Sequence, residues 1–236
     1  MQATNHGRAG KFSRRLFSLL LLGATLSCTG CNVVLLLGYL ISGPPQIEPD
    51  FDKVTKKSLS KRNTTVVVYC YAPNELKYDQ DKVDYEVAKC VAIRLNNQEI
   101  KVADPDRVYD WIDKHPDFER DVELGAAFNA NYVVKIELRD YSLFAERSHD
   151  LYQGRCDGII SVWEMDKKSD GTLKKTGKLI YSKDLLSRYP KEAPLPFNSY
   201  TTETFKKLFL AALSDEIGAK FYPTYAGDDY TRSIVQ

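Results

Sequence analysis

Two short motifs have the residue types and spacing of a serine acyl-transfer site. Ser58-Leu-Ser-Lys61 fits the pattern Ser-x-x-Lys, and Lys175-Thr-Gly177 fits the Lys-Thr-Gly element that accompanies it. In that chemistry the lysine helps the serine hydroxyl to act as a nucleophile, with the serine at the start of a buried helix and the Lys-Thr-Gly on a strand beside it. Here the first motif lies in a polar stretch and the second lies near a predicted hairpin turn. Chance therefore explains both motifs, and we expect no enzymatic activity.

Three cysteines follow residue 63 and could carry redox chemistry: Cys70, Cys90 and Cys156. Cys70 shares strand parity with Val66 and Val68, and Cys90 lies on the apolar stripe of a predicted helix, so both point toward a core. One interpretation is that they are small buried hydrophobes. The other is a disulfide between Cys70 and Cys90, which an oxidising compartment permits. The sequence leaves both open.

Metal and cofactor sites have little support. His115 and His149 stand alone, and no Cys-x-x-Cys pair occurs. The chain also has no Gly-rich phosphate loop, no Gly-x-Ser-x-Gly and no His-Glu-x-x-His. We expect no metal and no cofactor.

The charge balance argues against nucleic acid as a partner. Residues 1–30 hold four basic side chains and no acidic one, so 29 of the 33 Lys and Arg remain to face all 32 Asp and Glu. That remainder is mildly acidic and well mixed, whereas nucleic-acid binding needs a basic stripe. The 15 Tyr and 10 Phe favour an ordered fold.

The N-terminal segment has the layout of an export signal. Lys11-Phe-Ser-Arg-Arg15 precedes the uncharged, apolar run 16–26, and small residues follow. The pair Thr-Gly directly before Cys31 resembles the lipobox of bacterial lipoproteins, in which the cysteine is acylated and becomes the mature N-terminus. We therefore predict a signal peptide over 1–30 and lipidation at Cys31, with Cys28 as the second choice.

An uncleaved membrane-spanning helix is the alternative, because no charge occurs between Leu16 and Ile47. Either way the basic residues stay in the cytoplasm, so the rest of the chain lies outside it. Residues 31–63 contain Pro44, Pro45 and Pro49 and are expected to form a tether with extended character. The predicted address is the periplasmic side of the cell envelope, with a lipid anchor in a membrane.

Residues 64–223 are expected to form one globular domain, followed by a flexible tail over 224–236. In Asn131–Arg139, the residues Val134, Ile136 and Leu138 alternate with charged ones, which marks a strand with one packed and one wet face. Helical spacing marks an apolar stripe over 201–221. The other predicted elements are strands at 64–71, 100–102, 158–165 and 177–182, and helices at 81–97, from 105, and at 118–129.

This pattern predicts an α/β (α+β) fold with the order β-α-β-α-β-β-β-α. Each helix has one apolar stripe and the sheet has one packed face, so helices on one face of a mixed sheet form a two-layer sandwich.

Two stretches resemble a known group of envelope domains. Gly125-Ala-Ala-Phe-Asn-Ala-Asn-Tyr-Val-Val134 is similar to the junction of helix and third strand in the TolB N-terminal, CsgG- and LpoB-type lipoproteins, and Leu151-Tyr-Gln-Gly154 is similar to the start of their next strand. The resemblance covers roughly residues 64–223. It implies a non-enzymatic, lipid-tethered module that binds or assembles other envelope proteins.

The functional hypothesis is accordingly a protein-binding or assembly lipoprotein, with a self-assembling structural subunit or an unrecognised enzyme as alternatives. Its partners would be other envelope proteins or copies of itself. Two candidate surfaces follow from the strand pattern: the wet face around Lys135, Glu137 and Arg139, and a loop predicted over 142–153. The candidate residues of that loop are Arg147, His149 and Tyr152. Ordinary solvent-exposed surface is the alternative for both.

Overall fold

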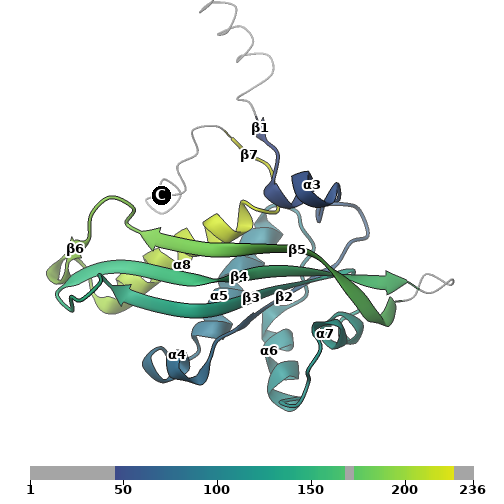
Figure 1. Cartoon of the computed structure of the whole chain (residues 1–236), viewed down its shortest axis with the longest axis horizontal. Helices are drawn as coiled ribbons and strands as arrows, with labels where there is room; N and C mark the ends of the chain where they lie inside the picture. The colour runs from purple at the N-terminus through teal and green to yellow at the C-terminus, as the bar shows by residue number, and fades with distance from the viewer. Residues whose placement is uncertain (1–45, 168–172, 226–236) are drawn as a thin grey trace, which may run out of the picture. The chain divides into compact units, whose positions relative to one another are not determined.

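A computed structural model describes residues 46–167 and 173–225. The signal segment and both candidate lipidation sites, Cys28 and Cys31, lie outside these residues. The centre of the fold is a sheet of five strands in the order β2-β3-β4-β5, with β6 paired to β4 (Figure 1). The strands are β2 (Val66–Tyr71), β3 (Tyr132–Phe144), β4 (Leu151–Lys167), β5 (Leu173–Tyr189) and β6 (Leu195–Pro196).

The sheet is mixed because its connections differ in length. β2 and β3 are parallel and are joined through helices, whereas β3, β4 and β5 are antiparallel neighbours joined directly. The register places Val68 opposite Val134, and Val134 opposite Val162. These three side chains are at most 1% exposed, so the alternation in β3 correctly identified its packed face.

Two long helices cover that packed face, α5 (Val83–Asn97) and α8 (Thr202–Gly218). Figure 1 shows both behind the sheet, crossing its strands. Their buried stripes, which include Leu95 and Phe209, join the sheet in the main hydrophobic core. The Thr201 hydroxyl accepts a hydrogen bond from the backbone N–H of Thr204 and so caps the start of α8. The expected two-layer α/β sandwich is confirmed.

A smaller second core lies on the opposite face at one end of the sheet. Val67 and Tyr69 of β2 pack there with residues of α6 (Pro105–Lys114) and α7 (Asp121–Ala127). The Tyr69 hydroxyl donates a hydrogen bond to Asp121 of α7. β2 therefore has both faces buried, which explains its unbroken apolar sequence.

The domain begins earlier than the sequence suggested. Residues 46–63 were expected to be tether, but Phe51 and Leu59 are completely buried in the main core. Phe51 lies on the short helix α3 (Asp50–Thr55), which follows strand β1 (Gln46–Ile47). At the other end, β7 (Thr224–Tyr225) pairs with β1, although these two residues were assigned to a flexible tail. Two large apolar side chains within a charged stretch are the signal that marks this segment as domain.

Two further expectations need correction. The strand predicted at 100–102 is a single parallel bridge between Val66 and Val102. The long loop predicted over 142–153 is the end of a hairpin, because β3 continues to Phe144 and β4 begins at Leu151. A short helix, α4 (Asn74–Asp79), occupies the loop before α5. Among the described residues, no helix is both long enough and apolar enough to span a membrane.

Candidate functional site: an open sheet face and an aromatic end

The charged residues predicted to face solvent on β3 do lie together on one face of the sheet. We call this surface the open face. Lys135 and Glu137 are half-buried, and Arg139 is exposed. The neighbouring strands add a row of mostly charged side chains to the same face: Asp157 on β4, and Asp184, Leu186 and Arg188 on β5.

The charges of the β3 row pair with one another and with their neighbours. Lys135 Nζ is 3.2 Å from Glu137 Oε2, and the Arg139 guanidinium is 3.7 Å from carboxylate oxygens of both Asp157 and Asp184. These pairs are solvent-accessible, and such pairs contribute little to stability. The row therefore resembles an ordinary solvated surface more than a site prepared for a partner.

A different surface, which we call the aromatic end, forms where the β3–β4 hairpin meets β6 and the start of α8. A stack of aromatic rings builds it from within. The ring of buried Tyr152 stacks on Phe205 of α8, with centroids 4.5 Å apart, and on Phe144, with centroids 5.6 Å apart. The Tyr152 and Thr202 hydroxyls are 2.8 Å apart, and this hydrogen bond fixes the stack to the first turn of α8.

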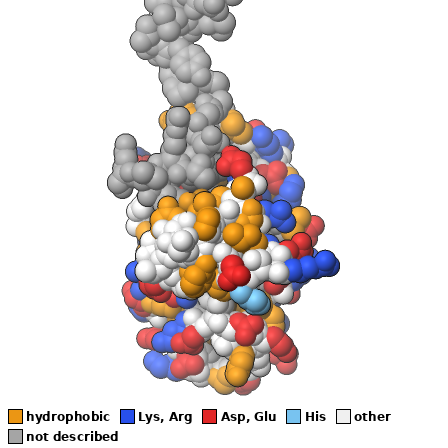
Figure 2. Space-filling view, turned by 90° about the vertical axis from the view of Figure 1, so that its left-hand side faces the viewer, with side chains coloured by type: hydrophobic (Ala, Val, Ile, Leu, Met, Phe, Trp, Pro, Cys, Tyr) orange, Lys and Arg blue, Asp and Glu red, His pale blue; other side chains and the backbone are white. Residues whose placement is uncertain are grey.

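Phe197 continues this stack outward to solvent. Its ring centroid is 5.0 Å from that of Tyr152, and its backbone N–H donates to the carbonyl of Asp150 at 2.9 Å. Phe197 is nevertheless 47% exposed, and Tyr200 is 43% exposed nearby in the chain. Figure 2 views the domain from this side and shows hydrophobic side chains gathered on it. Rigid, exposed aromatic side chains are enriched at the centres of protein–protein interfaces.

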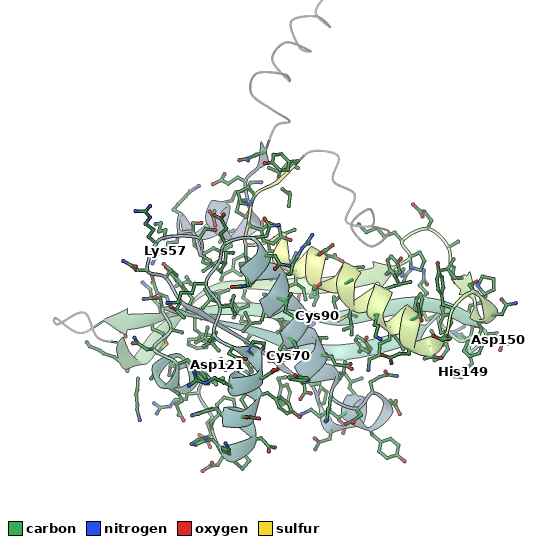
Figure 3. The ribbon with its side chains drawn as sticks, turned by 180° about the vertical axis from the view of Figure 1, so that it is seen from behind. Lys57, Cys70, Cys90, Asp121, His149 and Asp150 are labelled. Carbon is green, nitrogen blue, oxygen red and sulfur yellow. The ribbon has the colours of Figure 1, made fainter. Side chains whose placement is uncertain are left out.

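The predicted loop residues divide between the surface and the interior of the aromatic end. His149 is exposed, and its ring centroid is 5.9 Å from that of Phe144, while Arg147 is exposed at the hairpin tip. Figure 3 labels His149 at this end, away from Cys70 and Cys90. Tyr152 was a candidate for contact with a partner, and that is wrong: it is 0% exposed. It belongs to β4, whose alternation turns it into the core.

Sequence reasoning missed Phe197 and Tyr200, the exposed aromatic residues of this surface. They lie in a Pro-rich connection between β5 and α8, and its three prolines indicated only a loop. A phenylalanine and a tyrosine within such a loop were the available signal.

The cysteines do not form a reactive centre. Cys70, Cys90 and Cys156 are free thiols in the structure, and the Cys70–Cys90 disulfide stays a prediction. Burial raises the pKa of each thiol above its ordinary value. A nucleophilic cysteine needs the opposite shift, toward the thiolate. The three side chains therefore contribute to packing.

A groove with polar groups lies between α5 and α8 and has a volume of about 550 Å³. Its walls are mainly apolar, and its charged pair is closed on itself: Arg94 Nε lies 2.6 Å from Asp215 Oδ1 and donates to the Tyr222 hydroxyl at 3.0 Å. Within residues 46–167 and 173–225, no group of His, Cys, Asp and Glu has the arrangement of a metal site.

No family profile and no curated protein sequence matches this chain. Among solved structures, the fold is similar to a variant of the PelC dodecamer from Paraburkholderia phytofirmans, with 8% identity and a TM-score of 0.42 over 75% of this chain and 98% of that one. It is also similar to lipoprotein GNA1162 from Neisseria meningitidis, with 14% identity and a TM-score of 0.37 over 65% of this chain and 96% of that one. A minor lipoprotein from Acinetobacter baumannii has 10% identity and a TM-score of 0.26, over 67% of this chain and 90% of that one.

At such low TM-scores and identities, these likenesses assign neither a family nor a function. The resemblance to TolB, CsgG and LpoB domains stays a prediction.

Proposed function

We propose that this protein is a lipid-anchored, extracytoplasmic module of the cell envelope that binds another envelope protein through its aromatic end. The proposal has no catalytic step. The anchor follows from the basic and apolar run before Cys31, and the binding role follows from the surface that the domain presents.

The observation that carries the binding role is the exposure of Phe197 and Tyr200 above a buried aromatic stack. Tyr152 and its hydroxyl contact to Thr202 hold the base of that stack, so Phe197 is presented with little freedom to move away. A partner that covers it removes apolar surface from water without ordering a flexible loop, which is where binding energy is most easily gained. The paired charges of Lys135, Glu137 and Arg139 offer no comparable gain, because a partner would have to desolvate them.

Photo-cross-linking in intact cells tests the surface directly. A photoreactive phenylalanine analogue is placed at Phe197, and in a second strain at Leu179, which lies on β5 and is 48% exposed, close to the 47% of Phe197. We expect one dominant envelope protein to be captured from position 197 and not from position 179. Equal capture from both positions, or none from position 197, would overturn the proposed surface.

Substitution of the open-face residues provides the matched comparison. For this comparison the photoreactive analogue is placed at Tyr200, which is 43% exposed on the same surface. Phe197→Ser should then abolish capture of the partner, whereas the double substitution Glu137→Gln and Arg139→Gln should leave it intact. Loss of capture only in the second variant would move the site to the open face. Circular dichroism of each purified variant verifies that the domain remains folded.

The anchor is tested separately with labelled fatty acid. We expect Cys31→Ala to remove the label and to release the protein from membranes, and Cys28→Ala to leave the label in place. The reverse pattern would assign acylation to Cys28. If neither the wild type nor the variants incorporate the label, the prediction of a lipid anchor is refuted.

A further inference from the structure

The outer edge of β5 is an open strand edge. β5 ends the main sheet, and among the described residues no strand pairs with its outer side. Within residues 46–167 and 173–225, no backbone hydrogen bond from outside the sheet reaches residues 174–189. Helix α3 approaches β5 through Asp50, which contacts Tyr181 and Lys183, and leaves the stretch beyond them uncovered. An exposed edge of this length is a template for pairing with another chain.

The exposed side chains of residues 184–188 are arranged symmetrically about Leu186. Leu186 is 74% exposed on the open face, although it is a large apolar residue on an edge strand. Asp184 lies two residues before it and Arg188 two residues after it, so both project from the same face. Opposite charges thus stand at equal distances on the two sides of one exposed leucine.

From this pattern we propose that two copies of the protein associate by antiparallel pairing of their β5 edges about a two-fold axis at Leu186. In that register Leu186 faces Leu186 of the second copy, and each Asp184 faces an Arg188. Directly opposed side chains in an antiparallel pair approach closely enough for both contacts. The paired stretch runs from Lys183 to Tyr189 and ends at Pro190, which has no N–H to donate.

Neighbouring registers do not satisfy the same side chains. A two-fold axis at residue 184 would place the two Asp184 carboxylates against each other, and an axis at 188 would do the same with the two arginines. Axes at 185 or 187 would oppose Leu186 to a charged residue. Because like charges across strands are destabilising, the pattern selects the axis at Leu186.

Arg188 has a reason to accept a carboxylate from a second copy. It lies directly opposite Arg155 of β4, a like-charged pair, and within the described residues it makes no ion pair. Arg155 itself is 3.7 Å from Glu146. Asp184 of the second copy would supply the missing negative charge. A two-fold, self-complementary contact of this kind is the commonest way in which proteins form dimers.

This association is independent of the aromatic end, and charge reversal tests it on the full lipidated chain in detergent. Asp184→Arg opposes two positive charges, and Arg188→Asp opposes two negative charges, so each variant alone should be monomeric at concentrations where the wild type is dimeric. An equimolar mixture of the two variants should form a heterodimer, because every opposed pair is then complementary. The double variant D184R/R188D should also dimerise.

A cysteine cross-link tests the register. Leu186→Cys places two thiols opposite each other at a separation that a disulfide can span, and a copper(II) oxidant accepts the two electrons released on bond formation. We expect a cross-linked dimer in intact cells. Leu179→Cys, also apolar and exposed on β5, has no opposed counterpart in this register and should stay monomeric.

The outcomes are distinguishable. A heterodimer from the mixture together with the position-186 cross-link establishes the β5 pairing. A monomer at every concentration refutes association, and a dimer that neither charge reversal disturbs places the contact elsewhere. Capture of a partner from position 197 is unaffected by any of these results.

Discussion

Replacing Phe51 with alanine tests whether residues 46–63 belong to the folded domain. Phe51 is 0% exposed, and its ring is in contact with three other aromatic rings, those of Tyr132, Tyr181 and Phe221. If this segment were a tether, removing the ring would have no effect on stability. The structure instead makes the ring part of the main core, where its removal leaves a cavity.

Phe-to-Ala substitutions in cores cost about 3–5 kcal/mol, from lost burial and the cavity that remains. For a domain of this size, 1 kcal/mol lowers the melting temperature by about 2–4 °C, so Phe51→Ala should lower it by about 6–20 °C. The matched control is Val54→Ala on the same helix. Val54 is 61% exposed, so its truncation should change the free energy of unfolding by less than about 0.5 kcal/mol.

The assay is thermal and urea denaturation of wild type and both variants, followed by circular dichroism. A single cooperative transition in each protein is required before the free energies are compared. Equal stabilities for the Phe51 and Val54 variants would refute the packing of α3 and restore the tether interpretation. A lower free energy of unfolding in Phe51→Ala alone confirms that the domain begins near residue 46.

Three shorter predictions follow from other contacts. In Gly158→Ala, the new methyl group would lie 2.2 Å from the backbone carbonyl oxygen of Glu137, so strands β3 and β4 must separate. Urea denaturation should then show that the free energy of unfolding falls by about 1–3 kcal/mol. Unchanged stability would contradict the β3–β4 register. A hydrogen bond from Tyr181, and to a lesser extent the charges of nearby lysines, hold the pKa of Asp50 below its usual value of 3.8. The Asp50 carboxylate therefore stabilises the fold above pH 3.8, and this stabilisation is lost as the pH falls through the lowered pKa. Tyr181→Phe should therefore reduce stability at pH 7 more than at pH 2, and a deficit that is independent of pH would refute the linkage. Burial raises the pKa of Cys156, so its thiol should react with Ellman's reagent only as fast as the domain opens, and rapid labelling of the folded protein would show that the site is accessible.

The alternation of residues determined much of the sheet in advance. Val134, Ile136 and Leu138 were placed on the packed face of β3, and all three are buried. Strict alternation is reliable because a slip of one residue would expose the whole apolar set. The apolar run of β2 carried a second signal that went unused, since Val67 and Tyr69 are buried on the opposite face and require cover from α6 and α7.

What the sequence could not provide was the length and direction of irregular elements. β3 shifts register between Leu138 and Asp140 and again between Ser142 and Phe144. Such bulges interrupt the alternation of apolar and polar residues that identifies a strand. The interrupted pattern therefore predicted a loop where Tyr152 lies. Phe197 escaped notice for the converse reason: its exposure depends on a tertiary stack between segments distant in the chain, which local periodicity does not encode.

The pairing of β1 with β7 has a consequence for the connectivity of the chain. Because Gln46 lies opposite Tyr225, the polypeptide enters and leaves the fold at neighbouring points. Directly opposed residues of antiparallel strands are separated by about 5 Å, so a linker of a few residues could join the two ends. The chain could then be opened at the hairpin tip beside Arg147, which is exposed. Such a circular permutant would keep every strand contact of the sheet while beginning its synthesis at β4.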